Sequence, residues 1–125
     1  MKKMVTVATL SVLVFCLSVG VATADKSSVT LDVPQSVQKE AELTIRVTVT
    51  HSANTALHYT EWLKVTVNQK EVARWDYTSN SRPEAAVFTK ELKLKAAENM
   101  EITAQASCNN HGSKGPGTVK VTVRE

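Results

Sequence analysis

The chain has 125 residues, of which 42% are hydrophobic and 22% are charged, and its formal net charge is +3. A chain of this length forms one domain around one hydrophobic core. Two of the 15 basic residues lie in an N-terminal segment that we expect to be removed, which leaves 13 basic against 12 acidic residues. This near neutrality argues against a nucleic-acid partner, which a basic patch would reveal.

Residues 1–24 have the pattern of a signal peptide. Lys2 and Lys3 precede an apolar run from residue 4 to about residue 21, and Ala22-Thr23-Ala24 offers the small residues that a signal peptidase reads. We therefore expect cleavage after Ala24, a mature domain at 25–125, and an exported, periplasmic protein with no stable membrane association. An N-terminal membrane anchor is the alternative, because the run approaches the ~20 residues of a spanning helix.

Alternating apolar and polar residues predict short strands along the rest of the chain. The clearest case is 41–50, where Leu43, Ile45, Val47 and Val49 share one face. Seven short strands with regular turn signals and no long helical pattern predict an all-β fold, an immunoglobulin-like antiparallel β-sandwich. The expected strands cover 28–33, 41–50, about 58–67, 71–77, 86–94, 100–106 and 119–123.

Cys108 is the cysteine that remains after cleavage, because Cys16 lies in the signal peptide. A lone thiol in an exported protein is buried and inert, paired between chains, or bound to metal. The stretch Cys108-Asn109-Asn110-His111-Gly112 favours metal, since donors at Cys-x-x-His spacing can grip one ion from a single loop.

All three histidines of the chain lie in two short stretches, with Cys108 in one of them. On the predicted layout His51 ends the second strand, His58 opens the third, and His111 follows the sixth, so these donors can meet at one edge of the sandwich. Thiolate and imidazole ligands suit zinc, copper or iron and poorly suit calcium or magnesium. The sequence therefore predicts a metal site formed by His51, His58, Cys108 and His111.

His58-Tyr59-Thr60-Glu61-Trp62, followed by Cys108-Asn109-Asn110-His111-Gly112, resembles the iron domain of the desulfoferrodoxins and neelaredoxins, the superoxide reductases. The resemblance extends to Leu31-Asp32-Val33-Pro34, to 43–49 and to Arg82-Pro83-Glu84-Ala85. It implies an immunoglobulin-like sandwich that holds one non-haem iron. It assigns equatorial positions to His51, His58 and His111, and the axial thiolate to Cys108.

The resemblance also implies an enzyme that reduces superoxide by one electron to hydrogen peroxide. Family members carry a Glu-Lys-His-x-Pro element near the start, and the matching stretch here is Asp25-Lys26-Ser27-Ser28-Val29. Lys26 is retained as a catalytic residue that attracts the anionic substrate, but the fourth histidine is missing. Water, Asp25 or another carboxylate, or the new N-terminal amine would take its place.

Two further points concern ligands and partners. One more residue separates His51 from His58 than in the family, which makes His51 the least typical of the expected ligands. No rubredoxin-like centre precedes the domain, so a separate exported redox protein would supply electrons. The aliphatic edges of the sandwich would also allow self-association as a homo-oligomer.

Other functions remain open on the sequence. A cupredoxin-like electron carrier would need an axial methionine beyond His111, and the chain has none there. A zinc site is a stronger alternative, because three histidines and one cysteine would fill a tetrahedron. A third is a non-catalytic binding or electron-transfer module that has lost the chemistry together with one histidine.

Overall fold

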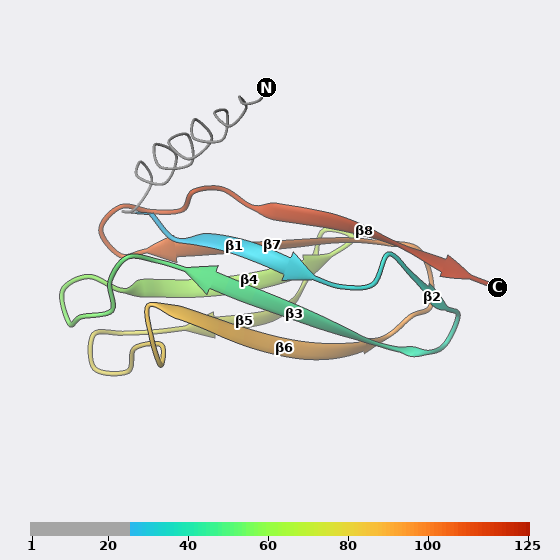
Figure 1. The fold of residues 1–125 in the computed structure, drawn as a ribbon, viewed down its shortest axis with the longest axis horizontal. Helices are drawn as coiled ribbons and strands as arrows, with labels where there is room; N and C mark the ends of the chain where they lie inside the picture. Colours follow the sequence, from blue (N-terminus) through green and yellow to red (C-terminus); the bar gives the residue numbers. More distant parts are fainter. Residues whose placement is uncertain (1–25) are drawn as a thin grey trace, which may run out of the picture.

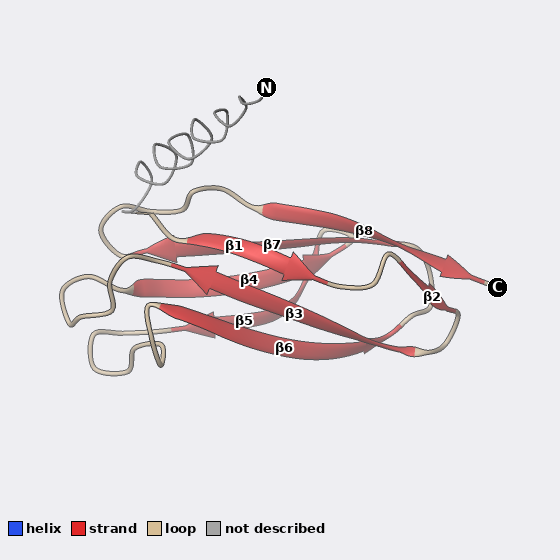
Figure 2. Cartoon of the chain, in the orientation of Figure 1, coloured by secondary structure: helices blue, strands red, loops and turns tan. Residues whose placement is uncertain are grey.

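Two β-sheets pack face to face (Figure 1). The computed structural model describes residues 26–125, so the predicted signal peptide and Asp25 lie outside the described residues. The described residues form strands and loops only (Figure 2), and they include no helix long and apolar enough to cross a membrane. The predicted all-β sandwich is confirmed. Its strands are β1 (Ser28–Asp32), β2 (Ser36–Gln38), β3 (Glu42–Thr50), β4 (Thr60–Val67), β5 (Lys70–Asp76), β6 (Val87–Lys95), β7 (Met100–Cys108) and β8 (Gly117–Arg124).

The two sheets follow from alternation along the strands. One sheet has the order β1-β3-β6 and the other β2-β8-β7-β4-β5. In β3 the predicted apolar face is fully or almost fully buried, while Arg46 on the other face is exposed. In β7, Ile102, Ala104 and Ala106 are all 0% exposed. Burying a valine, leucine or isoleucine side chain contributes about 1.5–3 kcal/mol, and an alanine methyl less, so β3 contributes most of this burial and β7 adds Ile102.

β2 is a strand that periodicity did not predict, because three residues are too few to show alternation. It pairs with β8 in parallel, whereas the other strand pairs are antiparallel. Pro34 lies between β1 and β2 and cannot donate to a ladder. The chain crosses there from the three-stranded to the five-stranded sheet, and Val37 packs into the core at 8% exposure.

β4 begins at Thr60 and not at His58 as expected, and it starts with a bulge. Thr60 pairs with Cys108 and Trp62 pairs with Ser107, so Glu61 is the extra residue. A bulge shifts the alternation of side chains by one position. Thr60 and Leu63 are therefore both buried, at 2% and 0% exposure. The bulge turns Thr60 inward and leaves His58 in the loop before the strand.

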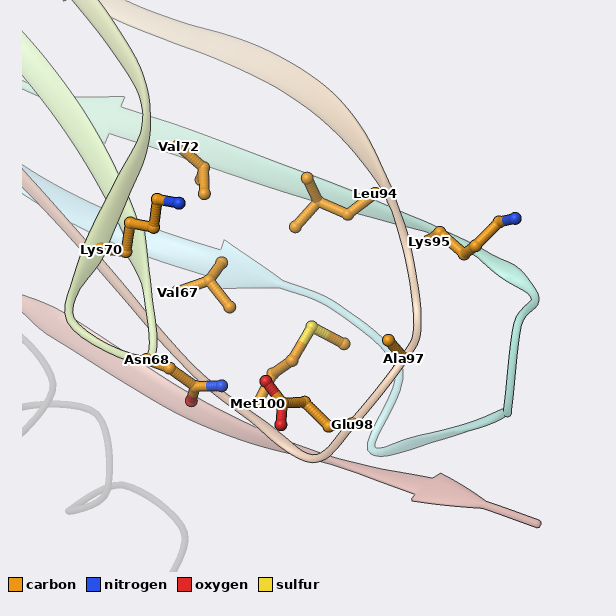
Figure 3. Close-up of a pocket in the computed structure, with 9 residues that line it drawn as sticks. All are labelled: Val67, Asn68, Lys70, Val72, Leu94, Lys95, Ala97, Glu98 and Met100. Carbon is orange, nitrogen blue, oxygen red and sulfur yellow. The ribbon is translucent and has the colours of Figure 1, made fainter.

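The ends of the sandwich differ in what they collect. At one end β3 and β7 finish and β4 begins, which brings the histidine stretches together at the left of Figure 1. At the other end lies an open depression of about 440 Å³ between the β4–β5 and β6–β7 turns (Figure 3). Its lining contains no histidine and no cysteine: Val67, Asn68, Lys70, Val72, Leu94, Lys95, Ala97, Glu98 and Met100.

Candidate metal centre

Cys108 is the last residue of β7, and a tight loop follows it. The Cys108 N–H donates to the Gly112 carbonyl at 2.9 Å, and the Gly112 N–H donates back to the Cys108 carbonyl at 3.0 Å. Gly112 has φ 81°, in the left-handed region that glycine adopts without strain. The closed loop places His111 Nδ1 3.8 Å from Cys108 Sγ.

The sulfur of Cys108 faces backbone donors of its own loop. The N–H of Asn110 lies 3.3 Å from Sγ, and the N–H of His111 lies 3.4 Å from it. Cys108 is 2% exposed. Because hydrogen bonds compensate the loss of water around a buried polar atom, these amides suit a sulfur that acts as an acceptor, as a thiolate ligand does.

His58 sits in a short turn of the β3–β4 loop. The Thr55 N–H donates to the His58 carbonyl at 2.8 Å, and the His58 N–H lies 3.1 Å from Thr55 Oγ1. His51 directly follows β3, is 5% exposed, and donates its N–H to the Ala86 carbonyl at 3.1 Å. The backbone of His58 is thus held within its own loop, and that of His51 by the residue before β6.

Three of the predicted ligands form one close group, and His111 contacts two of them. Donor atoms of His51, His58 and Cys108 all lie within 4.8 Å of one another, and His111 Nδ1 lies 3.2 Å from His58 Nε2. The ring centroids of His51 and His58 are 4.7 Å apart, and those of His58 and His111 are 5.0 Å apart. Ligands about 2.0–2.3 Å from one ion lie at most about 4.6 Å from each other. His51, His58 and Cys108 therefore fit a single metal ion with little rearrangement, and His111 would join them from beside His58 and Cys108.

Burial changes across this cluster. His51 and Cys108 are buried, His58 is half-buried and His111 is exposed. The cluster is therefore not an enclosed cavity, and solvent reaches it from the His111 side. This openness is what a site needs if a small molecule is to approach a bound ion.

Lys26 is exposed and immediately precedes a residue that is tied to the cluster. Ser27 is 0% exposed, and its N–H donates to the Gly112 carbonyl at 3.3 Å. Its hydroxyl lies 2.7 Å from Thr60 Oγ1, in a buried hydrogen bond. Lys26 therefore emerges beside the Cys108–Gly112 loop. Asp25, one candidate for the missing ligand position, lies outside the described residues.

Sequence reasoning missed a tie and a buried hydroxyl in the β3–β4 and β5–β6 loops. Asn54 Nδ2 donates to the Pro83 carbonyl at 2.8 Å, which ties the β3–β4 loop to the β5–β6 loop. The Tyr77 hydroxyl is buried, and no described residue hydrogen-bonds to it. Burial, followed by the nearby charge of Glu84, raises the pKa of Tyr77 to about 12. The motif Arg82-Pro83-Glu84-Ala85 marked this loop without showing its role.

Comparison with known proteins gives a family and a fold. A model of the desulfoferrodoxin family matches residues 21–113. The structure is similar to the superoxide reductase (neelaredoxin) of Ignicoccus hospitalis, with a TM-score of 0.67 and 18% identity over 79% of this chain and 82% of that chain. The structure is also similar to a proposed superoxide reductase of Thermotoga maritima. That comparison has a TM-score of 0.60 and 22% identity over 78% of this chain and 86% of that chain.

A protein from outside this group has a similar architecture. The PKD domain of an M14-like peptidase from a Thermoplasmatales archaeon gives a TM-score of 0.60 at 10% identity, over 82% of this chain and 100% of that chain. No curated protein matches the chain in sequence at a significant level. Structural similarity at these identities establishes the immunoglobulin-like fold.

Proposed function

The chain belongs to the desulfoferrodoxin family, and we propose that it is an exported superoxide reductase that holds one non-haem iron. The observation that carries the proposal is the convergence of four donors, His51, His58, Cys108 and His111, on one small space. A shared fold hosts many activities. The donor cluster within this family is therefore the argument for the activity.

The protein side of the mechanism follows from the cluster. The three imidazoles and the Cys108 thiolate would hold the iron, which when bound supplies the single electron that superoxide takes up. Thiolate donation and hydrogen bonds around the ligands tune the ease with which such a metal is oxidised. The two N–H groups that point at Cys108 Sγ are the groups of this chain that act on that balance.

Positive charge near the cluster would guide the substrate. Lys26 precedes Ser27, and the N–H of Lys114 donates to the Ser27 carbonyl at 2.9 Å, so both lysines belong to the same rim. Both are exposed. Cations at the mouth of a site raise the encounter rate of an anion such as superoxide, and salt weakens this effect. We assign the steering role to Lys26.

Export and electron supply complete the proposal. The predicted signal peptide at 1–24 would deliver the domain to the periplasm. Each turnover consumes one electron, and a separate exported redox protein would return it.

A second function follows from the ligand count. The chain has three histidines in all, and three imidazoles with one thiolate make a complete tetrahedral zinc set. A zinc site of this kind would leave no position for superoxide. The protein would then be a non-catalytic metal-binding module of the same family.

Metal analysis with visible spectroscopy separates the two functions. The reductase is expected to contain about one iron per chain, to show a thiolate-to-iron absorption band when oxidised, and to form hydrogen peroxide from superoxide. A colourless zinc protein that removes superoxide no faster than its spontaneous dismutation would overturn the proposal in favour of the second function. Cys108→Ser should remove the band while circular dichroism still reports a folded sandwich. Colour and activity that survive this change would show that the thiolate is not a ligand.

A further inference from the structure

Asn110 contacts two metal-binding segments at once. Its backbone N–H donates to Cys108 Sγ at 3.3 Å, and its side-chain amide donates to the Leu57 carbonyl at 2.9 Å. Leu57 is the residue before His58. One residue thus joins the sulfur to the peptide that carries an imidazole from another loop.

Asn109 contacts the residues on both sides of His58. Its Oδ1 accepts the N–H of Tyr59 at 2.9 Å, its own N–H donates to the Tyr59 carbonyl at 3.0 Å, and its Nδ2 donates to the Leu57 carbonyl at 3.3 Å. The regular pairing of β4 with β7 begins only at Thr60 and Cys108. The two asparagines therefore continue the contact between these segments beyond the end of the ladder, on both sides of His58.

Apolar packing does not fix this loop. Leu57 is 81% exposed, so its side chain contributes almost nothing to holding His58 in place. Thr55 closes the turn within the loop, but both partners of that turn belong to the same segment. Asn54 ties the loop to the β5–β6 loop, and the hydrogen bonds from Asn109 and Asn110 are the ones that join it to the Cys108–His111 segment.

We propose that Asn110 is a positioning residue that couples His58 to Cys108, so that imidazole and thiolate meet a metal as one preformed unit. The inference rests on the proposed metal site and adds to it a residue that would not itself touch the metal. Residues that orient ligands typically change metal affinity by 10–100-fold when they are replaced. Asn110 is exposed, water competes for its amide, and Asn109 Nδ2 also donates to the Leu57 carbonyl, so we expect the lower end of this range.

Asn110→Leu provides the test, because it keeps the size of the side chain and the backbone N–H to sulfur but removes the amide donor. Co(II) serves as the probe, since its visible spectrum reports the geometry of its ligands. We expect Co(II) affinity, measured by competition with a chelator, to fall about tenfold, and the ligand-field bands to shift. Asn110→Gln, which retains an amide, should recover part of both.

Two further measurements separate positioning from general destabilisation. Asn99→Leu removes an asparagine that accepts the Val123 N–H at 2.8 Å, at the other end of the sandwich. This control should lower the melting temperature slightly and leave Co(II) binding unchanged. In the metal-free protein, ¹⁵N relaxation should show faster motion at Leu57 and His58 in Asn110→Leu and not in Asn99→Leu.

The outcomes separate this inference from the proposed function. Unchanged Co(II) affinity and spectrum in Asn110→Leu would overturn the coupling and leave the proposed iron site intact. A reduced affinity that Asn110→Gln fails to recover, or that Asn99→Leu reproduces, would also overturn it. Coupling observed with Co(II) in a protein that contains no iron and reduces no superoxide would support the positioning role and overturn the reductase.

Discussion

Asparagine side chains form hydrogen bonds between loops at both ends of the sandwich, but the two ends differ in the other side chains that lie there. At the cluster end, Asn109 and Asn110 bond across to the residues around His58. At the other end, Asn68 accepts the Glu101 N–H at 2.9 Å, and its amide donates to the Asn99 carbonyl at 3.2 Å. Asparagine side chains continue backbone pairing beyond the strands at both ends. The presence of such asparagine hydrogen bonds at one end therefore does not by itself indicate a functional site.

What differs is the set of side chains that each end gathers. The cluster end brings together three imidazoles and one thiol with donor atoms a few ångströms apart. The other end has a depression of about 440 Å³, into which Val67, Leu94 and Met100 point (Figure 3), and its charges are spread around the rim. A hollow shows where space exists, whereas converging donor atoms show where an ion can be held.

Single substitutions at the two ends of β7 have the largest expected effects, one on metal affinity and the other on the stability of the fold. Cys108→Ser should lower metal affinity by more than about 100-fold, because replacing a residue that only orients a ligand already costs 10–100-fold. Met100→Ala should destabilise the fold by about 2 kcal/mol through the cavity it leaves, with metal affinity unchanged. Chelator competition and urea denaturation measure the two quantities. A metal defect in Met100→Ala would end the contrast between the two ends.

The burial gradient across the cluster predicts a second contrast. His51→Ala and His111→Ala should both weaken metal binding by about 100-fold or more, since each removes a proposed ligand. In the metal-free protein, His51→Ala should cost about 1–3 kcal/mol because His51 is 5% exposed. His111→Ala should stay within about 0.5 kcal/mol, because His111 is exposed. Unchanged metal stoichiometry in His51→Ala would remove His51 from the ligand set.

The buried hydrogen bond between Ser27 and Thr60, near the cluster, can be compared with an exposed one for its contribution to the free energy of unfolding. Both hydroxyls are buried, so Ser27→Ala leaves Thr60 without this partner and should cost about 1–3 kcal/mol in urea denaturation. Adding Thr60→Val should recover most of the loss, because an apolar pair needs no hydrogen bond. Thr103→Val, which breaks an exposed contact with Thr118, should change stability by less than about 0.5 kcal/mol. Equal losses at the buried and the exposed pair would contradict this reasoning.

The smallest expected effect concerns Tyr77 in the β5–β6 loop. Its pKa of about 12 in the folded protein exceeds the usual value of 10.0, because burial favours the neutral phenol. Between about pH 10 and pH 12 the folded state binds more protons than the unfolded state, so stability falls as pH rises. Tyr77→Phe should leave stability near pH 7 almost unchanged and flatten this alkaline decline. An equally steep decline in the variant would assign it to other groups.

The sequence predicted the features that depend on local pattern or on residue type alone. Strict alternation in 41–50 defined β3, and the residue types and spacing of the histidines and Cys108 predicted the donors that the structure brings together. β2 escaped because three residues show no period. The bulge at Glu61 escaped because pairing with β7, not local pattern, decides which way Thr60 points.

The supporting contacts were beyond sequence reasoning for a different reason. Nothing in Asn109-Asn110 indicates that their amides meet the Leu57 carbonyl, since the partners are 52 and 53 residues away and the contact arises only from the strand order. The fourth ligand position of the family stays a prediction, because Asp25 lies outside the described residues.

The anchoring of Ser27 sets a practical rule for handling the protein. Ser27 is anchored to Gly112 at the cluster end, so an attachment at the amino end joins the domain there, whereas Glu125 lies at the far tip, where its backbone oxygen accepts the Gln38 amide (Figure 1). A purification tag or a surface tether at the amino end would crowd the exposed side of the donor cluster, which the proposed substrate and electron donor would approach. The same attachment at the carboxyl end leaves that side clear, so immobilised protein on an electrode should be tethered through its last residue.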